Sequence, residues 1–251
     1  MVSTLLFDFG ATLDGPLYWL DRFVAQYRTA GLELVRCELD PAYRHASEAA
    51  SRARRVVERF GFVELVRMIV GQQIEFLANA GPERVRGQLG ALDSRGRHRA
   101  VEQITVLFVE ESRRGMECGR TVLAALAPRY KIGVVSNWYG NLERVLAEAG
   151  MAPFISAIAD SARIGFEKPD PRIFTAALKL LGATPDQAAM IGDSLEKDCA
   201  PARRLGLRSV WYRPAADPLG VGGVNHSARD GETASVDCIV TDLAELTELR
   251  L

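Results

Sequence analysis

Residues 188–198 read AAMIGDSLEKD, a short run of small and apolar residues that ends in an acidic turn. The first five residues are typical of a strand buried inside a sheet, and a helix-like segment follows at 197–205. Asp193 and Asp198 lie about one helical turn apart beside the end of this strand, a pair of oxygen ligands that suits a hard cation. The alternative is that both residues cap the start of a helix and face solvent.

The same pattern of apolar run and polar or glycine-containing turn recurs along the chain. Further runs lie at 3–8, 132–136, 155–160 and 209–212, and a weaker one lies at 238–240. After residue 130 the runs are separated by helix-like segments at 141–149, 171–181 and 197–205. This alternation predicts an α/β protein with a Rossmann-like core and a central parallel sheet. In such sheets ligands bind at the carboxyl ends of the strands.

More than a hundred residues separate the first run from the second, and they have a helical pattern almost throughout. Apolar residues recur at helical spacing in three segments: Leu17, Leu20, Phe23, Val24 and Tyr27; Phe62, Leu65, Val66, Ile69 and Phe76; Val101, Ile104, Leu107 and Phe108. We therefore predict a helical domain at 16–120, inserted into a core formed by 1–15 and 121–251. The turn at 14–16 and the polar segment 110–120 are its expected borders, and the Pro- and Gly-containing segment 213–237 is an expected surface loop.

Composition excludes several classes of protein. The 251 residues are 48% hydrophobic, enough for a sizeable core, and the net charge of −1 gives no general attraction to nucleic acid or membrane. The four cysteines form no CxxC pair, so neither a zinc site nor a disulfide framework is indicated. Residues 1–7 lack a basic segment, and no run of about 18 apolar residues occurs. We expect a cytoplasmic monomer or homodimer whose partner is a small molecule.

Two other predicted strand ends and one segment before a helix carry polar side chains. Asp8 ends the first run, where a carboxylate can be a nucleophile or metal ligand, or an ordinary turn residue. Ser136 and Asn137 end the second run, where a hydroxyl and an amide can bind a phosphoryl oxygen or cap the next helix. Lys168 precedes a helix that starts with Pro171, and its ammonium can neutralise developing negative charge or remain solvated.

Together the segments FDFGATL (7–13), VVSN (134–137), GFEKPDPRIF (165–174) and MIGDSLEKD (190–198) resemble motifs one to four of the haloacid-dehalogenase superfamily. The resemblance covers the whole predicted core, and motifs three and four are highly specific in this form. The helical insertion between motifs one and two resembles the C1-type cap of that superfamily. The resemblance implies a magnesium-dependent phosphatase-type hydrolase that acts on a small phosphorylated metabolite.

Roles for individual residues also follow from the resemblance. Asp8 would attack phosphorus and form an aspartyl-phosphate, while Ser136 and Lys168 would hold the transferring phosphoryl group. Asn137 and Thr12 are the implied substrate contacts. In phosphoryl transfer, positioning and charge neutralisation supply most of the catalysis.

The implied magnesium site uses four residues. Asp193 would bind Mg²⁺ together with Asp8 and the backbone carbonyl of Gly10, and Asp198 would ligate or orient the same shell. The metal and Lys168 would cancel the repulsion between the Asp8 carboxylate and an anionic phosphate.

Gly10 is the departure from the superfamily pattern, because phosphatases of this type carry a second Asp there as general acid and base. A glycine keeps the backbone carbonyl but has no carboxyl group to transfer a proton. General acid–base catalysis is typically worth about 10²–10⁴-fold in rate. Three outcomes stay open: a leaving group that needs no acid, a substitute such as Asp14 or a residue of the insertion, or a phospho-ligand-binding protein with little turnover. A phosphotransferase is a further alternative, since poor activation of water would prolong the phosphoenzyme.

Two other branches of the superfamily fit less well. The 2-haloacid dehalogenases also lack the second Asp but work without metal, and the pair Asp193 and Asp198 argues against that chemistry. Phosphonatases use a cap lysine as an imine-forming group, whereas the first lysine here is Lys131, beyond the insertion. The insertion is rich in arginine, notably at 52–55 and 95–99, which suits anion recognition or a solvated surface. Its histidines, His45 and His98, show no spacing typical of metal ligands.

Overall fold

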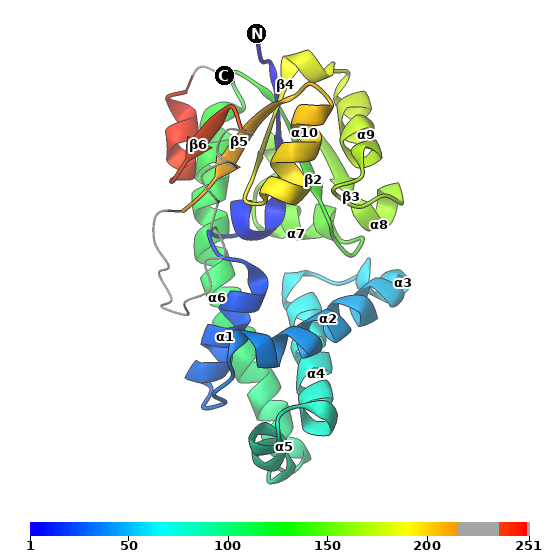
Figure 1. Ribbon diagram of the computed structural model, residues 1–251, viewed down its shortest axis with the longest axis vertical. Coiled ribbons are helices and arrows are strands. Elements are labelled where there is room, and N and C mark those ends of the chain that lie inside the picture. Colours follow the sequence, from blue (N-terminus) through cyan, green and yellow to red (C-terminus); the bar gives the residue numbers. More distant parts are fainter. Residues whose placement is uncertain (215–235, 250–251) are drawn as a thin grey trace. The chain divides into compact units, whose positions relative to one another are not determined.

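Six parallel strands form a single sheet in the order β3-β2-β1-β4-β5-β6 (Figure 1). The structure is a computed structural model in which residues 1–214 and 236–249 are described. The strands are β1 (Thr4–Phe7), β2 (Lys131–Ser136), β3 (Ala157–Asp160), β4 (Ala188–Gly192), β5 (Arg208–Tyr212) and β6 (Cys238–Val240). This order places the reversal of strand sequence beside β1, which is where open α/β sheets bind ligands. The predicted α/β fold class is confirmed.

All six predicted strands are present, and most of their bounds lie within one residue of the expected ones. The exception is β3, which begins at Ala157, two residues later than expected, because Phe154 belongs to the short 3₁₀ helix η2 (Ala152–Phe154). The surface loop expected at 213–237 lies mostly outside the described residues. β1 is the central strand, and Leu5, Leu6 and Phe7 are completely buried, which explains the continuous apolar run.

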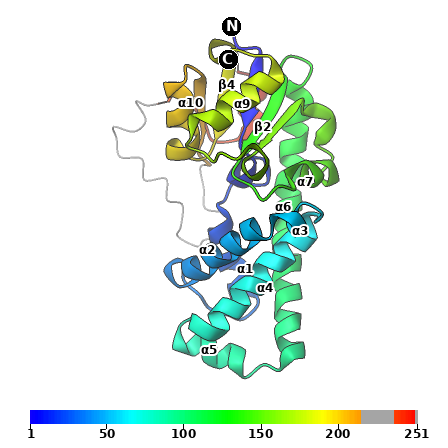
Figure 2. The ribbon, with the colours of Figure 1, turned by 90° about the vertical axis from the view of Figure 1, so that its right-hand side faces the viewer.

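Helices cover both faces of the sheet. Figure 2 shows α9 (Pro171–Leu181) and α10 (Ala200–Arg204) on one side of the strands and α7 (Leu142–Glu148) with the end of α6 (Ser94–Leu126) on the other. Right-handed crossovers explain this arrangement. The helices that precede β2 and β3 lie on one face of the sheet, and the helices that precede β4 and β5 lie on the other face. The α9 face buries Ile173, Phe174 and Leu178 against β1, β2 and β4.

The ends of α9 are encoded locally. The side chain of Asp170 accepts a hydrogen bond from the backbone of Arg172 at 2.9 Å, and Pro171 occupies the first turn, where no N–H is needed. Gly182 ends the helix with φ 63°, a left-handed conformation that favours glycine. These signals explain why the predicted and observed bounds of this helix agree.

The helix predicted at 197–205 is interrupted. A wide turn, η4 (Leu195–Cys199), comes first, and α10 starts only at Ala200. The hydroxyl of Ser194 accepts a hydrogen bond from the backbone of Lys197, and the carbonyl of Ser194 accepts bonds from Asp198 and Cys199. Pro201 lacks an N–H group and therefore suits the first turn of a new helix rather than the interior of a long one. Three short elements remain: α8 (Ser161–Ile164) and the 3₁₀ helices η3 (Pro185–Gln187) and η6 (Leu243–Thr247).

The described residues divide into two compact units. One, called here the sheet unit, contains residues 1–16, 113–214 and 236–249, and the other, called the helical unit, contains 17–112. The helical unit holds α1 (Trp19–Thr29), α2 (Arg36–Arg52), α3 (Arg54–Val57), α4 (Phe62–Ala80), α5 (Glu83–Gly90) and the first part of α6. Its core includes Phe23 stacked on Phe108 with ring centroids 4.1 Å apart, and Trp19 against Phe108 at 4.9 Å. No helix among the described residues is long and apolar enough to cross a membrane.

The polar segment 110–120, expected to border the insertion, is helical and lies inside α6, a helix of 33 residues. Gly115 and Gly119 of this segment pack against the turn that follows β1. A Cβ atom added at Gly115 would lie 2.4 Å from the carbonyl oxygen of Asp14, and one added at Gly119 would lie 2.5 Å from that of Leu13. The glycines therefore serve close packing, and the polar residues between them do not interrupt the helix.

Candidate active site

The sheet brings three of the predicted residues to one edge. β1 pairs with β2 on one side and β4 on the other, with Phe7 opposite Val134 and Ile191. Asp8 directly follows β1, Ser136 ends β2 and Asp193 directly follows β4. Since parallel strands end at the same edge, side chains that are more than a hundred residues apart in sequence become neighbours.

One oxygen of Asp8 accepts two hydrogen bonds and forms an ion pair. Oδ1 lies 2.7 Å from the backbone nitrogen of Phe9, 2.8 Å from Oγ of Ser136 and 2.7 Å from Nζ of Lys168. Asp8 is nearly buried, at 8% exposure, and Oδ2 has no hydrogen bond among the residues that the structure describes. The carboxylate is thus oriented through one oxygen and keeps lone pairs available on the other.

Lys168 connects two carboxylates. Its ammonium lies 2.7 Å from Oδ1 of Asp8 and 2.7 Å from Oδ1 of Asp198, and the residue is 4% exposed. Burial alone lowers the pKa of a lysine, but the charges and hydrogen bonds of Asp198 and Asp8 outweigh it, and the pKa of Lys168 is raised. Lys168 therefore remains charged in the site.

Asp198 lies beneath the end of β4. It is completely buried, and its Oδ2 accepts a hydrogen bond from the backbone of Ser194 at 3.1 Å. Burial raises the pKa of Asp198 to about 6, although the charge of Lys168 acts in the opposite direction. A Cβ atom at Gly192 would lie 2.4 Å from Oδ2 of Asp198, so only glycine leaves room for this carboxylate.

Asp8, Asp193 and Asp198 together fit a metal ion. One carboxylate oxygen of each lies within 4.8 Å of those of the other two. Burial, followed by the charges of Asp198 and Asp8, raises the pKa of Asp193 well above its ordinary value. When all three carboxylates are ionised, the ammonium of Lys168 leaves two negative charges uncompensated, and a divalent cation with oxygen ligands would balance them and favour the ionised forms. The contact expected from the carbonyl of Gly10 stays a prediction.

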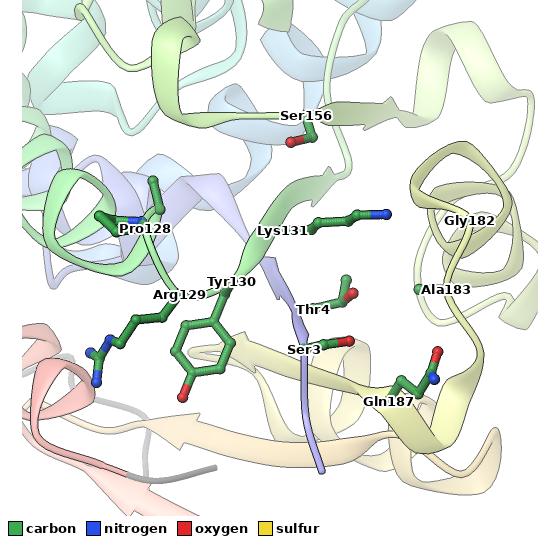
Figure 3. A pocket seen from close by; sticks show the side chains of 11 residues that line it. Ser3, Thr4, Pro128, Arg129, Tyr130, Lys131, Ser156, Gly182, Ala183 and Gln187 are labelled. Atoms are coloured by element: carbon green, nitrogen blue, oxygen red, sulfur yellow. The ribbon is translucent and has the colours of Figure 1, made fainter.

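The opposite edge of the sheet contains a cavity of about 520 Å³. It is lined at the starts of the strands by Thr4, Lys131 and Gln187, with Ser3 and Ser156 nearby (Figure 3). Lys131 points toward the end of α9, where its ammonium donates to the carbonyl of Leu181 at 3.3 Å. None of the predicted site residues lies at this edge.

The sequence profile of haloacid dehalogenase-like hydrolases matches residues 6–206. The chain belongs to this family. It is 34% identical over 172 residues to a phosphoserine phosphatase of Thermus thermophilus, covering 66% of this chain and 65% of that protein. It is 35% identical over 85 residues to a glyceraldehyde 3-phosphate phosphatase of Methanopyrus kandleri, covering 34% of this chain and 36% of that protein.

The chain thus spans less than two thirds of the length of either relative. Among solved structures, the 2-haloacid dehalogenase from Pseudomonas syringae pv. tomato has a TM-score of 0.52 and 21% identity, covering 99% of this chain and 97% of that one. At this identity the likeness concerns the fold alone.

Gly10 lies in an irregular turn, η1 (Phe9–Leu13). Its φ of −68° and ψ of 134° are open to any residue, and no heavy atom lies within 4 Å of a Cβ atom built there. The next residue, Ala11, has φ 57°, a left-handed conformation that is rare outside glycine. Asp14, weighed as a substitute acid, is completely buried, and its carboxylate accepts the Ala11 N–H at 2.8 Å. This bond favours the structural role for Asp14.

The two expected substrate contacts differ in their surroundings. Thr12 is buried, and its hydroxyl has no hydrogen-bond partner among the described residues. The amide of Asn137 is bonded to the backbone of Lys168 through both its oxygen and its nitrogen. Direct binding of substrate by either residue stays a prediction.

The sequence interpretation missed two residues that shape the candidate site. Asp160 ends β3 and accepts hydrogen bonds from the backbones of Gly140, Leu142 and Ala162, which fixes the loop after Ser136. Trp138 packs its ring edge-on against Phe9, with centroids 5.0 Å apart. A signal for Asp160 existed, because it follows an apolar run at a strand end as Asp8 and Asp193 do.

Proposed function

We propose that the protein is a magnesium-dependent phosphatase that hydrolyses a small phosphorylated metabolite through an aspartyl-phosphate on Asp8. The observation that carries this proposal is the arrangement of Asp8. Its Oδ1 accepts hydrogen bonds from Phe9 and Ser136 and forms an ion pair with Lys168, while Oδ2 has no hydrogen bond among the described residues. The family and the phosphatase names of the two relatives support a phosphorylated substrate. The helical insertion, proposed to span 16–120, would act as the cap that selects it.

In the first step Oδ2 of Asp8 attacks phosphorus. A bond forms between Asp8 and phosphorus, the bond from phosphorus to the leaving oxygen breaks, and its electron pair departs with the leaving group. The hydroxyl of Ser136 and the ammonium of Lys168 lie beside the Asp8 carboxylate, where they stabilise the negative charge on the transferring phosphoryl group. In the second step a bond forms between water and phosphorus, the bond from phosphorus to Oδ2 of Asp8 breaks, and its electron pair returns to the Asp8 carboxylate. The protons of the water leave with phosphate or pass to solvent.

A divalent cation held by Asp8 and Asp193, with Asp198 in support, would supply electrostatic stabilisation of the transferring group and offset its repulsion from Asp8. Lys168 is protonated when the cycle begins, since its two carboxylate partners raise its pKa. Its function is therefore to hold charge rather than to transfer a proton.

Because residue 10 is glycine, the first motif supplies no carboxyl group that could protonate the leaving oxygen. We propose that turnover is slow on alkyl phosphates, whose leaving groups need a proton, and faster on aryl or acyl phosphates, whose leaving groups depart as stable anions. Rates for one aryl, one acyl and one alkyl phosphate, measured with Mg²⁺ for the wild type and for Asp8→Asn, test this. Absence of turnover on all three, or activity that survives in Asp8→Asn, would refute it.

Gly10 also favours a second candidate, a phospho-ligand-binding protein with little turnover. Calorimetric titration with beryllium fluoride and Mg²⁺ would report formation of a phosphoenzyme analogue at Asp8. Tight binding combined with no hydrolysis of any tested phosphate would favour this candidate, and rapid hydrolysis would exclude it. A phosphotransferase would instead transfer the phosphoryl group to an added alcohol in preference to water.

A further inference from the structure

Asn137 holds the backbone of Lys168 at two points. Its Oδ1 accepts the Lys168 N–H at 2.7 Å, and its Nδ2 donates to the Lys168 carbonyl at 3.0 Å. A single side-chain amide thereby satisfies both backbone groups of one residue, in the way that a neighbouring strand would. The two residues are 31 positions apart, so the contact ties the end of β2 to the segment between α8 and α9.

The segment that carries Lys168 has no helix or strand of its own. It runs from Gly165, which ends α8, to Asp170, which caps α9, and both Glu167 and Pro169 are exposed. Lys168 is nevertheless 4% exposed. A buried ammonium on a long side chain needs a fixed backbone position, because its rotamer freedom would otherwise oppose simultaneous contact with two carboxylates.

The end of β2 also positions Ser136, whose hydroxyl donates a hydrogen bond to Asp8. Ser136 and Asn137 are consecutive, and Ser136 donates directly to Oδ1 of Asp8 while Asn137 fixes the residue whose ammonium reaches the same oxygen. The end of β2 therefore determines the relative position of both groups. A small displacement of the Lys168 backbone would lengthen the contacts of Nζ with Asp8 and Asp198.

We propose that Asn137 is a positioning residue that acts on catalysis through Lys168. The kinetic consequence rests on the proposed phosphatase function, whereas the structural consequence does not. Misplacement of a catalytic group by about 1 Å can lower a rate by about 10²-fold. A residue that binds substrate directly would instead act mainly on KM.

A kinetic comparison of Asn137→Ala, Lys168→Ala and the double variant tests the proposal. We expect Asn137→Ala to lower kcat by roughly 10- to 100-fold with KM nearly unchanged. In the Lys168→Ala background the same substitution should have little further effect, since the group that it positions is gone. Asn137→Asp, which keeps the acceptor and loses the donor, should give an intermediate kcat. A raised KM with kcat unchanged, or full additivity of the two substitutions, would overturn the proposal.

Amide hydrogen exchange measured by NMR gives a test that needs no turnover. The Lys168 N–H should be protected in the wild type, still protected in Asn137→Asp and at least about 10-fold faster to exchange in Asn137→Ala. Asn79→Ala is the matched control, because it removes an exposed amide that donates to the carbonyl of Glu75 at 2.9 Å, far along the sequence in α4. An unchanged exchange rate of the Lys168 N–H in Asn137→Ala would overturn the proposal that Asn137 fixes the Lys168 backbone, even if the protein is active. A protein without phosphatase activity but with this exchange pattern would refute the proposed function alone.

Discussion

At the scale of single residues, Gly10 offers a direct gain-of-function prediction. Its backbone conformation is open to any residue, and a Cβ atom there meets no heavy atom within 4 Å, so an aspartate fits without strain. If proton transfer to the leaving group is the missing step, Gly10→Asp should raise kcat on an alkyl phosphate by about 10²–10⁴-fold. The gain on an aryl phosphate should be much smaller, because its leaving group needs no proton. Steady-state kinetics on both substrates measures the difference.

Gly10→Asn is the matched control for that variant. It has nearly the same shape as the aspartate but has no carboxyl proton to transfer, so kcat on the alkyl phosphate should stay near the wild-type value. An equal gain in both variants would indicate an effect of size or binding. No gain in either would mean that another group already supplies the proton.

The neighbouring Ala11 yields a prediction about stability. A left-handed conformation costs a non-glycine residue about 1–2 kcal/mol, and glycine loses about 0.4–1 kcal/mol through greater freedom of the unfolded chain. Ala11→Gly should therefore raise the free energy of unfolding by roughly 0.5–1 kcal/mol. Urea denaturation measures it. Ala176→Gly, within α9, is the control and should lower the same quantity by about 1 kcal/mol; a loss in both variants would contradict the prediction.

At the scale of elements, the packing of α6 against the turn after β1 opposes intrinsic helix propensity. Alanine favours a helix over glycine by about 1 kcal/mol, yet a Cβ atom at Gly119 would lie 2.5 Å from the Leu13 carbonyl. Overpacking of this kind typically costs about 1–3 kcal/mol. Gly119→Ala should therefore lower the free energy of unfolding and, by displacing the turn that carries Asp8, lower kcat. Gly87→Ala in α5, where a Cβ atom meets nothing within 4 Å, should stabilise the protein. A higher melting temperature in both Gly119→Ala and Gly87→Ala would show that α6 is not closely packed against this turn.

Elements could be predicted where local signals and tertiary packing agree. The four strand ends with Asp8, Ser136, Asp160 and Asp193 follow apolar runs that are buried in the sheet, and α9 has a cap, a proline and a terminal glycine. The segment 110–120 contains the change from one compact unit to the other at 112–113, but it is continuous helix, because its polarity reflects exposure of one helix face. The packing of its two glycines depends on a turn about a hundred residues earlier, and nothing local reports that contact.

The candidate site was predictable as a set of residues but not as a set of contacts. The strand-end positions of Asp8 and Asp193 follow from parallel pairing. The two hydrogen bonds between the Asn137 side chain and the Lys168 backbone join two loops that are 31 residues apart. The amide that was predicted to contact substrate therefore has the backbone of Lys168 as its partner in the structure. The ion pair of Asp198 with Lys168 could not be predicted from the sequence either, and the role of Asp198 as a metal ligand stays a prediction.

At the scale of the whole molecule, the strand order gathers negative charge at one edge of the sheet and so links folding to metal binding. Asp8, Asp193 and Asp198 repel one another there, and Lys168 offsets only one of the three charges. Such an arrangement destabilises the metal-free protein and is tolerated when a cation binds the folded state alone. Stability measured with and without metal therefore reports on the site through the entire fold.

Removal of one carboxylate should separate these two effects. In EDTA, Asp193→Asn should raise the melting temperature by roughly 2–4 °C, the shift that corresponds to about 1 kcal/mol for a chain of this size, because it relieves repulsion from Asp8 and Asp198. Mg²⁺ at about 100 times its dissociation constant should stabilise the wild type by about 2.7 kcal/mol, but should stabilise Asp193→Asn far less. Asp186→Asn, an exposed acidic position before β4, should behave as the wild type in both conditions. A wild-type melting temperature that does not respond to Mg²⁺ would remove the support for a metal site, whereas a response retained in Asp193→Asn would place the cation on other ligands.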